Sequence, residues 1–172
     1  MKYIYLLLTV ILLSSCNSIA SKVENPQSDD DRIKNMLIDA KAYSNSLEII
    51  DIQNMAEYTL PVILRMNGGK EVYIRSLEES SHPIGEIEYM RIEIMPEAKI
   101  IKGQGDNYYS VVRQETEQKL NGIDEIVHSS IKLVTESLDG GKNWTFGFLR
   151  KADISNYYPP ELAGEINKNL DY

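Results

Sequence analysis

Three side chains are the candidates for acid–base chemistry: Asp51, Glu57 and His128. Histidine has an ordinary pKa near neutrality, and a carboxyl group reaches neutrality only when burial or a neighbouring charge raises its pKa. Any of the three would serve as a general acid or base only if the fold encloses it in a cavity. The two histidines and the single cysteine lack the paired spacing of zinc ligands. The sequence therefore predicts no metal site and no cofactor.

A second candidate is the stretch SLDGGKNWTF at 137–146, which has the pattern Ser-x-Asp-x-Gly-x-x-Trp. It resembles the Asp box on the hairpins of sialidase-type propellers. In such a turn the aspartate accepts backbone N–H groups, the glycine takes a positive φ, and the tryptophan folds back over the hairpin. Asp139, Gly141 and Trp144 fit these roles. The motif occurs once, and no repeat of about 20 to 50 residues is present, so we expect a structural hairpin rather than a propeller or a catalytic site.

Tyrosines form the third group of candidates. Tyr58 and Tyr73 fall on predicted helices and Tyr89 on a predicted strand, and we expect their rings to rim a shallow hydrophobic cleft. Two further clusters, NYY at 107–109 and NYYPP at 156–160, either rim a cleft between helices and sheet or fill the edges of the core.

The elements that must position these residues change character near residue 86. Before it, apolar residues recur at helical spacing over 29–47, 51–69 and 70–81, with a break near Pro61. After it, the period changes to two over 86–96, 98–103, 107–118, 125–138 and 144–152, and 159–170 reads as a short terminal helix. Helices followed by an antiparallel meander predict an α+β domain, with the N-terminal helices packed on one face of a curved antiparallel sheet.

The inward faces of these elements predict the core. His128 alternates with Ile126 on the face opposite Val127, so we expect its imidazole to face solvent. We also expect Phe148 to share a face with the neighbouring aromatic residues of 144–152. The predicted interior residues are Leu37, Leu47, Val62, Ile74, Ile92, Val127, Ile131, Trp144 and Phe146.

The stretches AEYTLPVILRMNGGKEVYI and SLDGGKNWTF resemble small secreted proteins of Bacteroidetes-type bacteria. These share a threonine or tyrosine before a proline, a Gly-Gly-Lys after a short helix, and a Gly-Gly-Lys-x-Trp hairpin. The resemblance covers residues 40–160 and implies the nuclear transport factor 2-like, cystatin-like architecture, a cone of helices packed into a strongly curved sheet. That architecture includes isomerases, dehydratases, ligand-binding modules and dimerisation domains, so the resemblance implies a fold and leaves the function open.

The N-terminus, MKYIYLLLTVILLSSC, has the form of an export signal. Lys2 precedes an apolar run at 4–13 that is too short to span a membrane. The residues LSSC at 13–16 resemble the lipobox of bacterial lipoproteins, whose cysteine becomes the acylated first residue of the mature chain. Cys16 is therefore the expected lipidation site, and the alternative is an ordinary signal peptide with a chance cysteine.

These features divide the chain into a lipoprotein signal peptide at 1–15, a flexible tether at 16–29 and a single α+β domain at 30–172. A formal net charge of −8 without a basic cluster disfavours binding to nucleic acid or anionic lipid. We expect a bacterial cell-envelope protein, on the periplasmic face or the cell surface, that meets the membrane through its lipid anchor only.

The expected function is that of a non-catalytic lipoprotein that binds a small ligand or a protein partner, with a homodimer through the sheet as one arrangement. The alternative is an isomerase-like or hydrolase-like enzyme that uses Asp51, Glu57 or His128 inside the cone. A third hypothesis is a secreted inhibitor or immunity protein that blocks its partner with the loops at 102–107 and 119–124. A polar, ionisable residue inside a cavity would discriminate among them.

Overall fold

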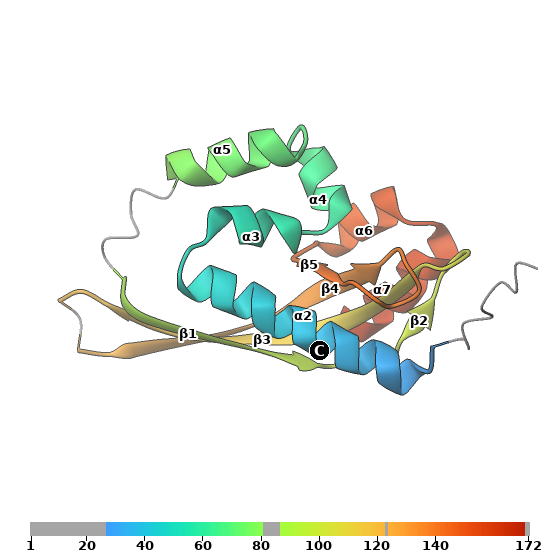
Figure 1. Cartoon of the computed structure of the whole chain (residues 1–172), viewed down its shortest axis with the longest axis horizontal. Coiled ribbons are helices and arrows are strands. Elements are labelled where there is room, and N and C mark those ends of the chain that lie inside the picture. The colour runs from blue at the N-terminus through green and yellow to red at the C-terminus, as the bar shows by residue number, and fades with distance from the viewer. Residues whose placement is uncertain (1–26, 81–86, 123, 171–172) are drawn as a thin grey trace, which may run out of the picture.

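The computed structural model describes residues 27–80, 87–122 and 124–170, and the side chains of 87–89 lie outside this description (Figure 1). The predicted signal peptide, Cys16 and most of the predicted tether also lie outside it. Helices lead the chain and an open, antiparallel five-stranded sheet follows, which confirms the predicted α+β class. Within the described ranges, no helix is both long and apolar enough to cross a membrane.

The strand order in the sheet is β1-β3-β4-β5, and β2 pairs with β3 beside this path. In chain order the elements are α2 (Asp29–Glu48), α3 (Ile52–Glu57), α4 (Pro61–Met66), α5 (Lys70–Ser80), β1 (Ile87–Pro96), β2 (Ile101–Lys102), β3 (Tyr108–Leu120), β4 (Ile126–Ser137), β5 (Thr145–Gly147), α6 (Lys151–Tyr157) and α7 (Pro160–Leu170).

Helix α2 begins at a capping box formed by Ser28 and Asp31. The Ser28 hydroxyl accepts from the Asp31 N–H at 3.1 Å, and the Asp31 carboxylate accepts from the Ser28 N–H at 3.2 Å. The predicted tether reaches residue 29, whereas Asp29 is the first residue of the helix. The boundary therefore lies one residue earlier than predicted.

Helix α2 packs on the sheet through Arg32, Met36 and Ala40, which are buried. The predicted core residue Leu37 is 38% exposed, so that prediction is wrong. The buried stripe is rotated because Arg32 docks on the sheet, with its guanidinium 3.9 Å from the centre of the Tyr108 ring. An arginine at a buried position does not contribute to an apolar pattern, so the spacing of apolar residues places the stripe one residue off.

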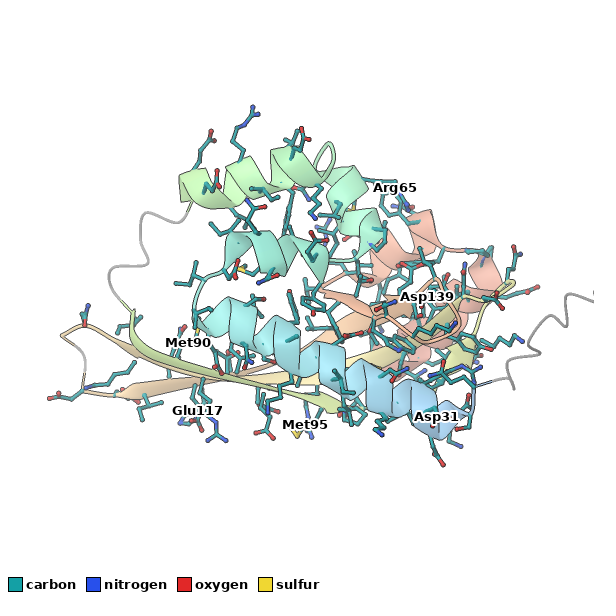
Figure 2. The ribbon with its side chains drawn as sticks, viewed as in Figure 1. Asp31, Arg65, Met90, Met95, Glu117 and Asp139 are labelled. Carbon is teal, nitrogen blue, oxygen red and sulfur yellow. The ribbon has the colours of Figure 1, made fainter. Side chains whose placement is uncertain are left out.

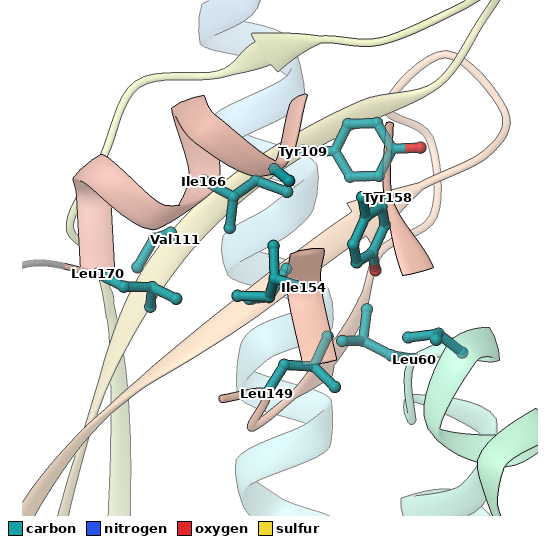
Figure 3. Packing of buried hydrophobic residues seen from close by; sticks show 11 residues of the cluster. Leu60, Tyr109, Val111, Leu149, Ile154, Tyr158, Ile166 and Leu170 are labelled. Carbon is teal, nitrogen blue, oxygen red and sulfur yellow. The ribbon is translucent and has the colours of Figure 1, made fainter. Parts of the chain in front are cut away.

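Helices cover both faces of the sheet, whereas the sequence predicted helices on one face. Successive strand residues point to opposite faces. Tyr108 of β3 packs in a cluster with Met36 of α2, and the next residue, Tyr109, packs in a second cluster with Val111 and Ile166 (Figure 3). Ile166 belongs to α7, and the same cluster contains Val62 of α4 and Ile154 of α6. Helix α2 therefore packs on one face of the sheet, and α4, α6 and α7 pack on the other.

Much of the predicted core is confirmed in these two clusters. Leu47 and Ile74 are half-buried. The predicted core residues that are fully buried are Val62, Ile92, Trp144 and Phe146.

The last strand is shorter than the predicted stretch 144–152, because β5 ends at Gly147 and α6 begins at Lys151. A Cβ at Gly147 would lie 2.2 Å from the Ile63 Cδ1, so only glycine allows this approach to α4. After Gly147 the chain leaves the strand, and Phe148 is 58% exposed, contrary to the prediction that it shares the face of its aromatic neighbours.

The outer part of the β3–β4 hairpin projects past the end of α2 (Figure 1). Helix α2 ends at Glu48, whose carboxylate accepts the Ile92 N–H of edge strand β1 at 2.6 Å. Val127 and Ile131 lie on the α2 face of the sheet but are 41% and 36% exposed, so their prediction as core residues is wrong. Alternation predicts the face correctly, and the end of α2 leaves that part of the face uncovered.

Candidate ligand-binding pocket

The three predicted acid–base residues lie apart from one another. Asp51 caps α3, and its carboxylate accepts the Asn54 N–H at 3.1 Å. Glu57 is exposed and pairs with Lys70. The His128 side chain is 67% exposed on β4, on the face opposite α2. None of the three lines the pocket described below.

Two of the three predicted cleft tyrosines gather around Tyr43 of α2. The ring of Tyr58 lies 6.5 Å from that of Tyr43, which stacks on Phe146 at 5.4 Å. Burial raises the pKa of Tyr43, and the charge of nearby Tyr73 raises it further. Tyr58 and Tyr73 therefore extend the packing around the α2 cluster, while the Tyr89 side chain lies outside the description.

The Asp-box stretch forms a turn with the expected contacts. Asp139 accepts N–H groups from Lys142 at 3.1 Å and Asn143 at 3.0 Å, and a hydroxyl from Ser137 at 2.8 Å. Burial alone would raise the pKa of Asp139, but these hydrogen bonds outweigh it and hold the pKa below its usual value. Gly141 has φ 91°, a conformation that favours glycine.

This turn also attaches the end of the sheet to α2. Trp144 is 1% exposed, and its indole N–H donates to the Gly141 carbonyl at 3.1 Å. Its backbone N–H donates to the Asp39 carboxylate of α2 at 2.8 Å. A Cβ at Gly141 would lie 2.4 Å from the Arg32 Cγ. The motif therefore packs the hairpin against α2.

A pocket of about 490 Å³ lies on the other face of the sheet. Strands β2, β3 and β4 form its floor, the junction of α6 and α7 forms one wall, and Arg65 reaches it from α4. The loop at 102–107 contributes Gly103, Gln104 and Asn107 to another side. Segments from residue 65 to residue 165 thus meet at one concave surface.

Glu136 is the buried acid of this pocket, at 8% exposure. It alternates with Val134 on β4, so strand geometry turns its carboxyl toward the α7 face. Burial raises the pKa of Glu136, against a hydrogen bond donated by Tyr109 and the more distant charge of Arg65. Among the described residues, no cation lies within ion-pairing distance of this carboxyl group.

Tyr109 and Tyr158 enclose the same side of the pocket. Their rings meet edge to face, with centres 5.6 Å apart and planes at 84° (Figure 3). Burial raises the pKa of Tyr109 to about 12, and the charge of Glu136 acts in the same direction. A Cβ at Gly103 would lie 2.5 Å from the Tyr109 ring, so the glycine allows the loop to pack against it.

The hydroxyl of Tyr158 is buried, and it has no hydrogen-bond partner in the described part of the chain. Burial raises its pKa first, and the charge of Glu136 second. A buried polar group without a partner is unusual in a native protein and calls for an explanation.

Sequence reasoning missed Glu136. The signal was present, because the alternation TES at 135–137 places one carboxylate on the face that also carries Val134. Tyr109 and Tyr158 belong to the two aromatic clusters for which the sequence predicted either a place at the core edge or a place at the rim of a cleft. The two tyrosines pack in the core and also line the pocket. The meeting of these residues depends on how α6 and α7 fold back onto β3, which no local pattern encodes.

The chain matches no protein-family model, no curated protein and no solved structure. The likeness to small secreted proteins with a cystatin-like fold stays a prediction. In the described ranges, no group of three or more histidine, cysteine, aspartate and glutamate side chains is arranged to hold a metal ion.

Proposed function

We propose that this protein is a non-catalytic lipoprotein of the cell envelope, anchored through Cys16, whose domain binds a small ligand in the Glu136 pocket. The observation that carries the proposal is a buried carboxyl group, without an ion-pairing cation among the described residues, in a pocket of about 490 Å³. Concave sites of this size with convergent polar groups are typical of small-molecule binding.

The chemistry of the lining supports binding more than catalysis. Burial moves the pKa of Tyr109 to about 12, which leaves this phenol a poor acid or base at neutral pH. Glu136 is the group that favours the alternative, an enzyme of the isomerase or hydrolase kind, because burial raises its pKa toward neutrality. The two functions differ in whether a bound compound is changed.

The test is binding without conversion. Full-length protein in detergent is titrated with a panel of cationic, neutral and anionic small compounds, and the melting temperature, the heat of binding and the recovered compound are measured. We expect a member of the panel to stabilise the fold, by about 2.7 kcal/mol at one hundred times its Kd, and to be recovered unchanged. Glu136→Gln should abolish this stabilisation.

The matched control is Glu93→Gln, because Glu93 is a strand carboxylate whose side chain is 61% exposed. This variant should keep the full response. Conversion of a bound compound that stops in Glu136→Gln would establish the enzyme instead. A panel in which nothing binds, or binding that Glu136→Gln leaves intact, would contradict the proposed pocket.

A further inference from the structure

We infer that the ligand of this pocket carries a primary or secondary ammonium group, which pairs with the carboxylate of Glu136 beside the rings of Tyr109 and Tyr158. This inference rests on the proposed function, because it names the chemical class that the pocket would bind.

The floor of the pocket presents acceptors. The Tyr109 hydroxyl already donates its proton to Glu136, so the remaining lone pairs of the carboxylate face no donor of the described chain other than this phenol. A ligand that pairs with this carboxylate must therefore bring N–H or O–H donors.

The charges that line the pocket favour a positively charged ligand. Glu136 is buried without an ion-pairing cation in the described residues, and a buried charge is normally paired. The two cations of the lining, Arg65 and Lys102, are exposed. The Lys102 ammonium lies 5.8 Å from the centre of the Tyr108 ring, and Tyr108 packs on the opposite face of the sheet. The missing counter-ion is therefore one that a ligand would supply.

Two further carboxylates also favour a positively charged ligand. Glu161 and Glu165 line the pocket from α7, four residues apart and so on one side of that helix. With Glu136 they give the lining three acidic groups against the two basic ones, and of the three Glu165 already pairs with Lys168 of the same helix. An anionic ligand would meet this acidic wall, whereas a cation is attracted to it.

The aromatic walls accept a cation as well. Tyr109, Tyr157 and Tyr158 all line the pocket, and an ammonium group over an aromatic face is attracted by the ring quadrupole. Neutral polar ligands gain little from this contact. A protonated amine thus pairs with the carboxylate and contacts the rings at once, while a quaternary ammonium lacks the N–H donors.

The closing experiment compares three probes with one apolar body and different head groups: cyclohexylammonium, cyclohexanol and cyclohexanecarboxylate. Their affinities for the full-length protein in detergent are measured at neutral pH by calorimetry. We expect cyclohexylammonium to bind at least tenfold more tightly than the other two. Glu136→Gln should remove this preference, and Glu93→Gln should leave all three affinities within twofold.

The outcomes separate the two proposals. Tighter binding of the alcohol or the carboxylate, lost in Glu136→Gln, would overturn the ammonium class and leave the pocket standing. Ammonium binding that survives in Glu136→Gln would place the probe elsewhere and overturn the inference. No binding of any probe, while a compound of the wider panel binds in a Glu136-dependent way, would overturn the class alone. No Glu136-dependent binding in either experiment would overturn both.

Discussion

At the scale of the residue, this domain buries polar groups that its own fold does not fully satisfy. The Tyr158 hydroxyl is buried without a partner in the described residues. Glu136 is buried with one phenol as its hydrogen-bond donor, and it has no ion pair within the described ranges. Each desolvation opposes folding, since protein groups that lose water without gaining a partner destabilise the native state.

Tyr158→Phe should therefore stabilise the ligand-free protein. It removes a buried, unpaired hydroxyl and keeps the ring that packs against Tyr109, so we expect the free energy of unfolding to rise by about 1 kcal/mol. Denaturant unfolding of the full-length chain measures the change. Tyr157→Phe is the control, because Tyr157 is 49% exposed, and it should change little. Destabilisation by Tyr158→Phe would show that the hydroxyl has a stabilising partner.

The stability of the protein should also depend on pH through Glu136. Its folded pKa is raised above the ordinary value of 4.5, so the folded state holds its proton where the unfolded state has lost it. The contribution of Glu136 is fully present below pH 4.5 and is lost as pH rises through the folded pKa. Stability should thus fall across this window in the parent, relative to Glu136→Gln.

Unfolding free energies of the two proteins, measured in steps from pH 4 to pH 8, test this sign. The difference between them should grow with pH and then level off above the folded pKa. A difference that is constant with pH would mean that Glu136 titrates alike in the folded and unfolded chains.

At the scale of the element, the 137–146 turn joins two parts of the fold. Asp139 organises the turn through backbone N–H groups, and Trp144 fills the space between the hairpin and α2. Figure 2 shows Asp139 on the hairpin that faces away from the projecting end of the sheet, where Glu117 lies. The turn is therefore remote from that exposed end and is part of the packed half of the molecule.

Asp139→Ala should cost about 1–2 kcal/mol of unfolding free energy, because it leaves the N–H groups of Lys142 and Asn143 without their acceptor. Trp144→Ala should cost about 3–5 kcal/mol, since a fully buried ring is deleted. Denaturant unfolding measures both, with the exposed Asp124→Ala as control. Ligand binding should persist in whatever fraction stays folded, and its selective loss at unchanged stability would give the turn a direct role in binding.

At the scale of the whole molecule, the two faces of the sheet are covered differently. Helix α2 and the Asp-box turn cover the packed half of one face, and the pocket opens on the other face, between β2, β3, β4 and the α6–α7 junction. Pairing of two sheets through edge strand β1 would meet Glu48, whose carboxylate already occupies the Ile92 N–H. The homodimer through the sheet stays a prediction. Strand pairing at this position would require Glu48 to release the Ile92 N–H.

The anchor is a property of the whole chain. Cys16→Ala should move the protein from the membrane fraction to the soluble fraction, because the acylated residue is lost, and several acyl chains are what hold such a protein firmly. Fractionation of cells followed by immunodetection measures this. Ser14→Ala keeps a small residue before the cysteine and should stay with membranes. Sedimentation of Cys16→Ala with the membranes would contradict the lipoprotein assignment.

The sequence by itself determined the α+β class, the order of helices and strands and the Asp-box turn, since these depend on local periodicity, glycine and capping. Only the tertiary structure decided what covers each face. Alternation correctly put Val127 and Leu133 on one face, but α2 covers only the second. The pocket also depends on the tertiary structure, because Glu136 and Tyr158 come together only when distant segments pack against one another. Periodicity tells which side chains share a face and carries no information about what packs against it.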